Sequence, residues 1–204
     1  LDSAWAVGTN AGGRSSAAGI ANTTYFLWAV LRPDTGVTDV IMDVSATAPT
    51  MPTNYTKKCR IGAILREAGA IVLFIQDRQR YERVALLDFA GDNVGATAVT
   101  RTLSVPIGAQ VIALGVAAIW AETTGPGVVW HLSDLDQADV AASLTAAPLG
   151  SVASGVSAAT ALIVAPFAVR VSTAGGIRSR ANASGALDHF KLVTLGWDDW
   201  QGRT

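Results

Sequence analysis

Residues 46–64, "ATAPTMPTNYTKKCRIGAI", pass from a proline-rich loop into an apolar strand. Pro49 and Pro52 hold φ near a fixed value and donate no ladder hydrogen bond, so the loop is stiff and directs the chain into the next run. From there polar and apolar side chains alternate, as on a half-buried strand. We predict a strand over 58–66, with Cys59 facing inward as a small buried hydrophobe.

Strand patterns continue on both sides of this stretch. The runs 24–32 ("TYFLWAVLR") and 37–44 ("VTDVIMDV") predict a hairpin closed by the turn "RPDTG". The turn "EAGA" leads into a predicted strand over 71–77. The pattern predicts further strands in 81–88, 96–104, 109–121 and 127–132, and in the closing runs "ALIVAPFAVRV", "GIRSRA" and "HFKLVTLGW". Only 133–144 predicts a helix, of one or two turns, with Ser133 as its cap.

Strands joined by short turns, with almost no helix between them, indicate an all-β fold. We predict an antiparallel β-sandwich of jelly-roll-like type. We expect residues 1–23 to be a Gly, Ser and Ala-rich N-terminal segment and residues 24–204 to form the sandwich domain. A division of that domain at the Ser, Ala and Gly-rich bridge 145–158 is the alternative.

The composition points to burial against other chains. Half of the residues are hydrophobic, 15% are charged and the mean hydropathy is +0.35, whereas about a quarter of the residues of an average domain are charged. Such a chain is expected to cover apolar surface with copies of itself or with a partner. The runs 111–121 and 159–169 are shorter than the roughly 20 residues of a spanning helix, so we expect no membrane insertion. A net charge of −1 predicts no nucleic-acid partner.

Few residues suggest chemistry. Cys59 is the only cysteine, which excludes an intramolecular disulfide and a thiolate metal cluster. His131 and His189 lack metal-ligand spacing and an accompanying nucleophile motif. Three aspartates gather in "SDLDQAD" (133–139), but the bend glycine of a calcium loop is missing, and a solvated cap is the better interpretation. We expect no catalytic residue, no metal and no cofactor.

Tryptophan is abundant, with six residues in the chain. Trp28 and Trp120 lie in apolar runs and are predicted to be core. Trp197 and Trp200 lie in "GWDDW" (196–200), where they are candidates for stacking on a sugar or for sealing a subunit contact, and we favour the subunit contact. The two adjacent aspartates between them point to opposite faces of a strand. A glycosidase needs two carboxyls that face one bond from about 5 to 9.5 Å apart.

Residues 32–64, "RPDTGVTDVIMDVSATAPTMPTNYTKKCRIGAI", resemble a module of tail-fibre and related virion proteins of tailed bacteriophages and prophages. That module has an aromatic strand, an Asp-Thr-Gly turn, a "vDv" strand, an "S-x-TAPT-hydrophobic-P" loop and then "YT-K-K/R-x-RIG". The ending "LGWDDWQGR" is similar to the family's close on Gly-Trp-x-Asp and Gly-Arg. The strong match covers 24–64, with weaker support in 70–77 and 196–203. Cys59 departs from the pattern, which has a basic residue there.

The resemblance implies a receptor-binding or fibre domain that is β-rich, homotrimeric, non-enzymatic and located in the virion. Its implied partners are sister copies, other virion proteins, and a bacterial surface glycan or outer-membrane receptor used for host attachment. Two alternatives stay open. One is a carbohydrate-active enzyme of the tailspike kind, and the other is a purely structural capsid or baseplate fibre without receptor contact.

Overall fold

The structure of the chain is a computed structural model that describes residues 3–6, 13–16, 19–121, 128–143, 145, 151–153, 161–182 and 188–200. The described residues contain β-strands and no helix, and all pairs of these strands are antiparallel. The predicted all-β class is confirmed. The chain divides into two compact units. Unit 1 is Leu1–Leu73 with Pro106–Ala109 and Asp199–Thr204, and unit 2 is Phe74–Val105 with Gln110–Asp198.

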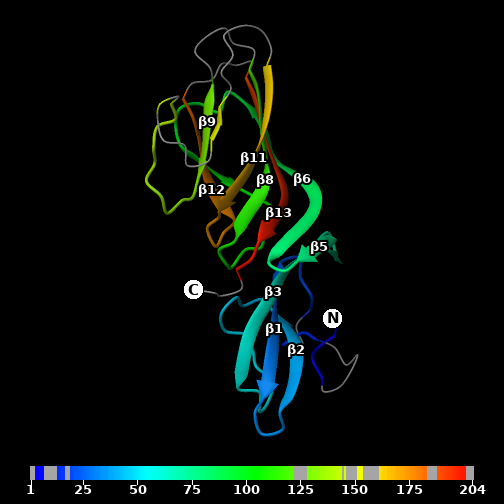
Figure 1. Cartoon of the computed structure of the whole chain (residues 1–204). Coiled ribbons are helices and arrows are strands. Elements are labelled where there is room, and N and C mark those ends of the chain that lie inside the picture. Colours follow the sequence, from blue (N-terminus) through cyan, green and yellow to red (C-terminus); the bar gives the residue numbers. More distant parts are fainter. Residues whose placement is uncertain are drawn as a thin grey trace. The chain divides into compact units, whose positions relative to one another are not determined.

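Unit 1 is built on a sheet with the order β2 (Val37–Asp43), β1 (Thr24–Arg32), β3 (Lys57–Glu67) and β4 (Ala70–Ile71). Strands β1 and β2 pair as the predicted hairpin (Figure 1). Alternate side chains of β1 point into the core, which is made of Phe26, Trp28, Val30, Ile41, Tyr55, Ala63 and Ala109. The predicted core position of Trp28 is therefore confirmed.

A β-bulge overturns the predicted orientation of Cys59. Leu27 lies opposite Gly62 while Trp28 lies opposite Arg60, so one extra residue of β3 is inserted between these pairs. A one-residue shift moves side chains to the other face of a strand. Cys59 is consequently exposed, and the predicted burial of this residue is wrong. Arg60 instead lies over the Phe26 ring, at 5.4 Å from its centroid.

Unit 2 is a sandwich of two sheets. The five-stranded sheet has the order β11-β8-β13-β6-β5, and the four-stranded sheet has the order β10-β9-β12-β7. These strands are β5 (Phe74–Asp77), β6 (Arg80–Asp92), β7 (Val99–Thr102), β8 (Ile112–Ala121), β9 (Val129–Ser133), β10 (Ser151–Ala153), β11 (Ala161–Arg170), β12 (Gly176–Ala181) and β13 (His189–Asp198). Without β5, the two orders are those of a jelly roll, in which consecutive strands alternate between the sheets except β9 and β10, which pair in the four-stranded sheet. The predicted jelly-roll-like sandwich is confirmed.

Aromatic residues fill the core of unit 2. Trp130 of β9 is fully buried and meets the ring of Phe190 edge-on, at 5.1 Å between centroids. Phe89 of β6 contacts the same indole from the side, at 6.4 Å. The two sheets are thus joined by rings from β6, β9 and β13, and the side chains on the opposite side of the five-stranded sheet face away from this core.

Two predicted elements differ from the structure. Residues 134–143 form no helix, because Ser133 ends β9 and Asp134 closes a turn in which its Oδ1 accepts the backbone N–H of Asp136 at 2.9 Å. The predicted strand 71–77 is split into β4 and β5, and the boundary between the two units lies at residues 73 and 74. The predicted bridge at 145–158 contains strand β10 (Ser151–Ala153), which the sequence pattern did not predict. The rest of the bridge lies largely outside the described residues, so a division there stays a prediction.

Candidate functional site

The two tryptophans singled out in the sequence lie in different environments. Trp197 is 0% exposed, and its ring stacks on Tyr81 at 5.3 Å between centroids within unit 2. A register shift between Thr194 and Gly196 turns Trp197 inward, where simple alternation would have turned it outward. Trp200 belongs to unit 1 and is 51% exposed. The buried Trp197 therefore has no accessible surface for a receptor or subunit contact. Such a contact at Trp200 stays a prediction.

The adjacent carboxylates of "GWDDW" are each held by an arginine. Asp198 pairs with Arg80 at 3.2 Å in unit 2. Asp199 is fully buried and pairs with Arg60 at 2.9 Å in unit 1. Each carboxylate is therefore engaged by an arginine of its own unit.

The outward side of the five-stranded sheet of unit 2 is a continuous apolar surface. Directly paired residues of antiparallel strands point to the same face, so the register identifies its members, apart from Leu195, which is unpaired at the bulge of β13 but lines the same hollow as Leu114 and Pro166. We name this surface the outer face, and it consists of Leu162, Val164, Pro166 and Ala168 of β11, Leu114, Val116, Ala118 and Trp120 of β8, Lys191, Val193 and Leu195 of β13, Glu82, Leu87 and Ala90 of β6, and Ile75 of β5.

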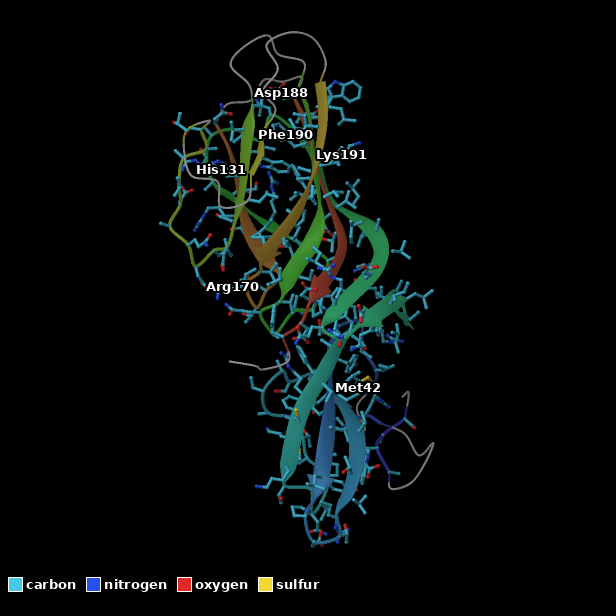
Figure 2. The ribbon with its side chains drawn as sticks, viewed as in Figure 1. Met42, His131, Arg170, Asp188, Phe190 and Lys191 are labelled. Atoms are coloured by element: carbon cyan, nitrogen blue, oxygen red, sulfur yellow. The ribbon has the colours of Figure 1, made fainter. Side chains whose placement is uncertain are left out.

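Several large side chains of the outer face are open to solvent. Leu162 is 63% exposed, Val164 is 56% exposed and Leu87 is 53% exposed. Trp120 also lies here, half-exposed, so its predicted place in the core is wrong. On the other side of β8, by contrast, Ile119 is completely buried. Figure 2 shows the same change of side on β13, where the consecutive residues Phe190 and Lys191 are labelled.

Charged groups gather at the two ends of the strands that carry the outer face. At one end Arg80 pairs with Asp198, and Arg170 pairs with Asp134 and Asp136. At the other end the imidazole of His189 lies against Asp92. The rim carboxylates of Asp92, Asp134, Asp136 and Asp198 are thus each engaged by a partner within the chain.

Two hollows lie on the outer face. The larger has a volume of about 680 Å³ and is lined mainly by Leu114, Pro166, Ala168 and Leu195, with Glu82 at its border. The smaller has a volume of about 360 Å³. Its lining residues include Trp120, Leu162, His189 and Lys191, and Asp92 is the residue among them that carries a carboxylate. Each hollow has one carboxylate residue among its lining residues.

The opposite sheet of unit 2 is covered by residues 134–143. The guanidinium of Arg178 donates to the carbonyl oxygens of Asp134, Leu135 and Gln137, at 3.3, 3.2 and 2.6 Å. Arg180 binds the carboxylate of Asp139 at 2.8 Å. The three aspartates of "SDLDQAD" are therefore engaged by arginines, and the described residues include no cluster of metal-ligand type.

His131 is enclosed beneath the same segment (Figure 2). The residue is buried on β9, and burial lowers the pKa of its imidazole below the ordinary value of 6.5. The hydrogen bond with the backbone of Val140 opposes this shift, and the nearby positive charge of Arg180 adds to it. The His131 ring is thus a structural group that is neutral at neutral pH.

The outer face was not identified from the sequence, although a signal for it exists. Strands β8 and β11 are apolar at nearly every position, a pattern typical of strands that are covered on both sides. Pairing partners and sheet order, which reveal which side lacks a cover, are properties of the tertiary structure.

No helix of the described residues is long and apolar enough to cross a membrane. No family model and no curated protein matches the chain. Among solved structures, one match is a chain of "Structure of infectious bursal disease virus Gx strain", with 11% sequence identity and a TM-score of 0.28. The match covers 91% of this chain and 53% of the other, so this chain spans about half the length of that one. A likeness at this level carries no argument about function.

Proposed function

We propose that the chain is a non-enzymatic structural protein of a phage virion, a tail-fibre or receptor-binding domain that attaches the particle to the bacterial host surface. The observation that carries this proposal is the module of residues 24–64, with its weaker companions at 70–77 and 196–203. In unit 1 residues 24–64 form one continuous piece of structure, made of β1, β2, the connecting loop and most of β3.

Polar side chains of the module shape the connection from β2 to β3. The carboxylate of Asp43 accepts the backbone N–H groups of Ser45 and Thr50, at 2.6 and 2.9 Å, and the hydroxyl of Ser15. The Trp28 indole N–H donates to the carbonyl of Ser45 at 3.2 Å. The hydroxyl of Tyr55 donates to the carboxylate of Asp39. These contacts support a constructional role for the module, because each fixes backbone or packs a strand.

Attachment is assigned to the loops between strands, since loops vary without disturbing the sheets that carry them. The partners would be a bacterial surface glycan or an outer-membrane receptor, and other virion proteins. The assembly would be a homotrimer, which is consistent with the small share of charged residues.

The geometry favours this function over a tailspike-like enzyme. Glycoside hydrolysis uses two carboxyl groups on either side of one bond. The larger hollow of the outer face has Glu82 beside Arg80 and Arg83, and the smaller has Asp92 against His189. Neither set of lining residues contains a second carboxylate.

Binding of the purified, fluorescently labelled chain to a panel of bacterial strains and to a glycan array tests the proposal. Saturable binding to some strains or glycans, without release of sugar, is the expected result. Release of reducing sugar from bacterial polysaccharide would instead support the enzyme. Absence of binding to every strain, together with a position away from the tail tip, would overturn receptor attachment and favour the purely structural fibre.

A further inference from the structure

We propose that the outer face of unit 2 is the surface through which copies of this chain associate. This inference deepens the proposed function and rests on it for the identity of the assembly, a homotrimer of a virion protein. It assigns the contact to one side of one sheet.

The first argument is the side-chain pattern of β8. Val116 and Ala118 lie on the outer face, while Ala117 and Ile119 are fully buried against the other sheet. A strand that is apolar on both sides is typical of a sheet covered on both sides. In the described residues of this chain only the inner side of β8 has a cover.

The second argument is the size of the surface. Strands β8, β11 and β13 have 10 residues each, in a five-stranded sheet. At about 3.3 Å per residue and about 4.8 Å between strands, the face measures roughly 20 by 30 Å. That is on the order of 600 Å² in projection, at or above the largest apolar patch of a typical monomer. It is close to the roughly 800 Å² of accessible surface that each partner buries in a stable interface.

The third argument is the distribution of charge. An interface core lacks charged residues, while its rim is polar. The rim pairs Arg80–Asp198 and His189–Asp92 lie at opposite ends of the strands, and each places a carboxylate against a partner within the chain. Within the outer face Lys191 and Glu82 stand on different rows and carry opposite signs. These two opposite charges balance, so the outer face does not repel a sister copy by net charge.

The partner that covers the outer face is a second copy of the chain, because so apolar a face needs a permanent partner. Interfaces that never open are the more hydrophobic ones, resembling a domain core cut in half. A sister copy is present from synthesis onwards. Association by adding strands at the open edge is disfavoured, since Pro166 lies in the middle of edge strand β11 and has no N–H to donate. The sister copies therefore contact one another through the side chains of the outer face and not by adding strands at its edge.

The test compares masses in solution by sedimentation velocity. Wild-type protein is expected at a multiple of 21.0 kDa. The substitutions Val164→Glu and Leu87→Glu place a charge at two separate points of the outer face, and each is expected to weaken association at least tenfold. Both side chains are exposed in the single chain, so the dissociated variants should keep a cooperative thermal unfolding transition. The matched control is Val40→Glu, an exposed valine on β2 of unit 1, which should leave the mass unchanged.

Hydroxyl-radical footprinting of the wild type provides a second measurement that needs no variant. Trp120 and Leu162 should become protected as the protein concentration rises and the mass increases. A monomeric wild type, or face variants that keep the wild-type mass, would overturn the inference. A monomer that still binds bacterial cells would leave the proposed function standing. A face-dependent oligomer that binds no strain would leave the inference standing and remove receptor attachment.

Discussion

At the scale of single residues, tight backbone approaches determine which positions of the five-stranded sheet accept only glycine. Gly196 lies at the irregular part of β13, opposite Glu82 on one side and Leu114 on the other. A Cβ at this position would overlap the carbonyl oxygen of Tyr81 and approach the Cα of Glu82 to 3.1 Å. Backbone atoms cannot yield as the end of a flexible side chain can.

We therefore predict that Gly196→Ala lowers the free energy of unfolding by about 1–3 kcal/mol, the usual cost of overpacking. Urea denaturation measures the effect. The matched control is Gly19→Ala, because a Cβ at Gly19 meets no atom within 4 Å. Equal stability of Gly196→Ala and wild type would show that β13 does not approach β6 as described.

The buried imidazole of His131 makes stability depend on pH. Burial lowers its pKa in the folded state below 6.5, so on acidification the unfolded chain takes up the proton first. Stability is then independent of this group above pH 6.5 and falls as the pH drops below it, until the folded-state pKa is reached.

We predict that wild-type protein loses more thermal stability than His131→Gln between about pH 7 and about pH 5. Scanning calorimetry at several pH values measures the difference. The slopes of the two proteins should coincide above the normal histidine pKa. A wild-type stability that rises on acidification relative to His131→Gln would contradict the assignment.

At the scale of elements, two irregular segments are held by single side chains. The loop between β2 and β3 depends on Asp43. Burial raises the pKa of this carboxyl, but the hydrogen bonds from Ser15, Ser45 and Thr50 outweigh burial and hold the pKa below 3.8. The ionised form thus stabilises the fold above that pH, and the contribution is lost as the pH falls through the lowered value.

We expect Asp43→Asn to cost about 1–3 kcal/mol, because an amide group cannot accept all of these hydrogen bonds. Urea unfolding at neutral pH provides the measurement. Asp34→Asn, which removes an exposed carboxylate paired with Arg32, should change stability by less than about 0.5 kcal/mol. If both variants lose the same amount, Asp43 has no special part in the loop.

The segment 134–143 depends on Arg178, whose guanidinium holds the carbonyl oxygens of residues 134, 135 and 137. Removing the donors leaves this irregular segment with few backbone contacts, so it should open more often. We predict that Arg178→Met increases the rate of proteolytic cleavage within 134–143 several-fold, as measured by mass spectrometry of the fragments. Arg32→Met, at a surface ion pair of unit 1, is the control and should leave that rate unchanged.

At the scale of the whole molecule, the association proposed for the outer face is apolar, and its response to salt follows from that. Salt screens interactions between exposed charges and does not weaken apolar contacts. We expect the mass of the assembly to be equal or larger at about 1 M sodium chloride than at about 0.1 M. Dissociation by salt would indicate that the rim charges, rather than the apolar face, hold the copies together.

Local patterns sufficed to identify the class of the fold. Alternation and turn residues located the hairpin β1–β2, strand β3 and the strands of the jelly roll other than β10, because each of these signals arises within a few neighbouring residues. Side-chain placement was predicted wrongly at Cys59, Trp120 and Trp197. Cys59 and Trp197 each lie beside a β-bulge, and one inserted residue reverses the side to which the side chains beyond it point. Trp120 lies on the outer side of β8, which the strand pattern alone does not reveal.

The sequence by itself determined that this chain is an antiparallel β protein rich in apolar residues, since composition and period are local properties. The tertiary structure alone decided where the exposed apolar side chains gather. Trp120, Val164 and Leu87 are far apart in the chain and come together only because β11, β8, β13 and β6 pair in that order (Figure 1). Strand order depends on long-range pairing, which no local pattern specifies.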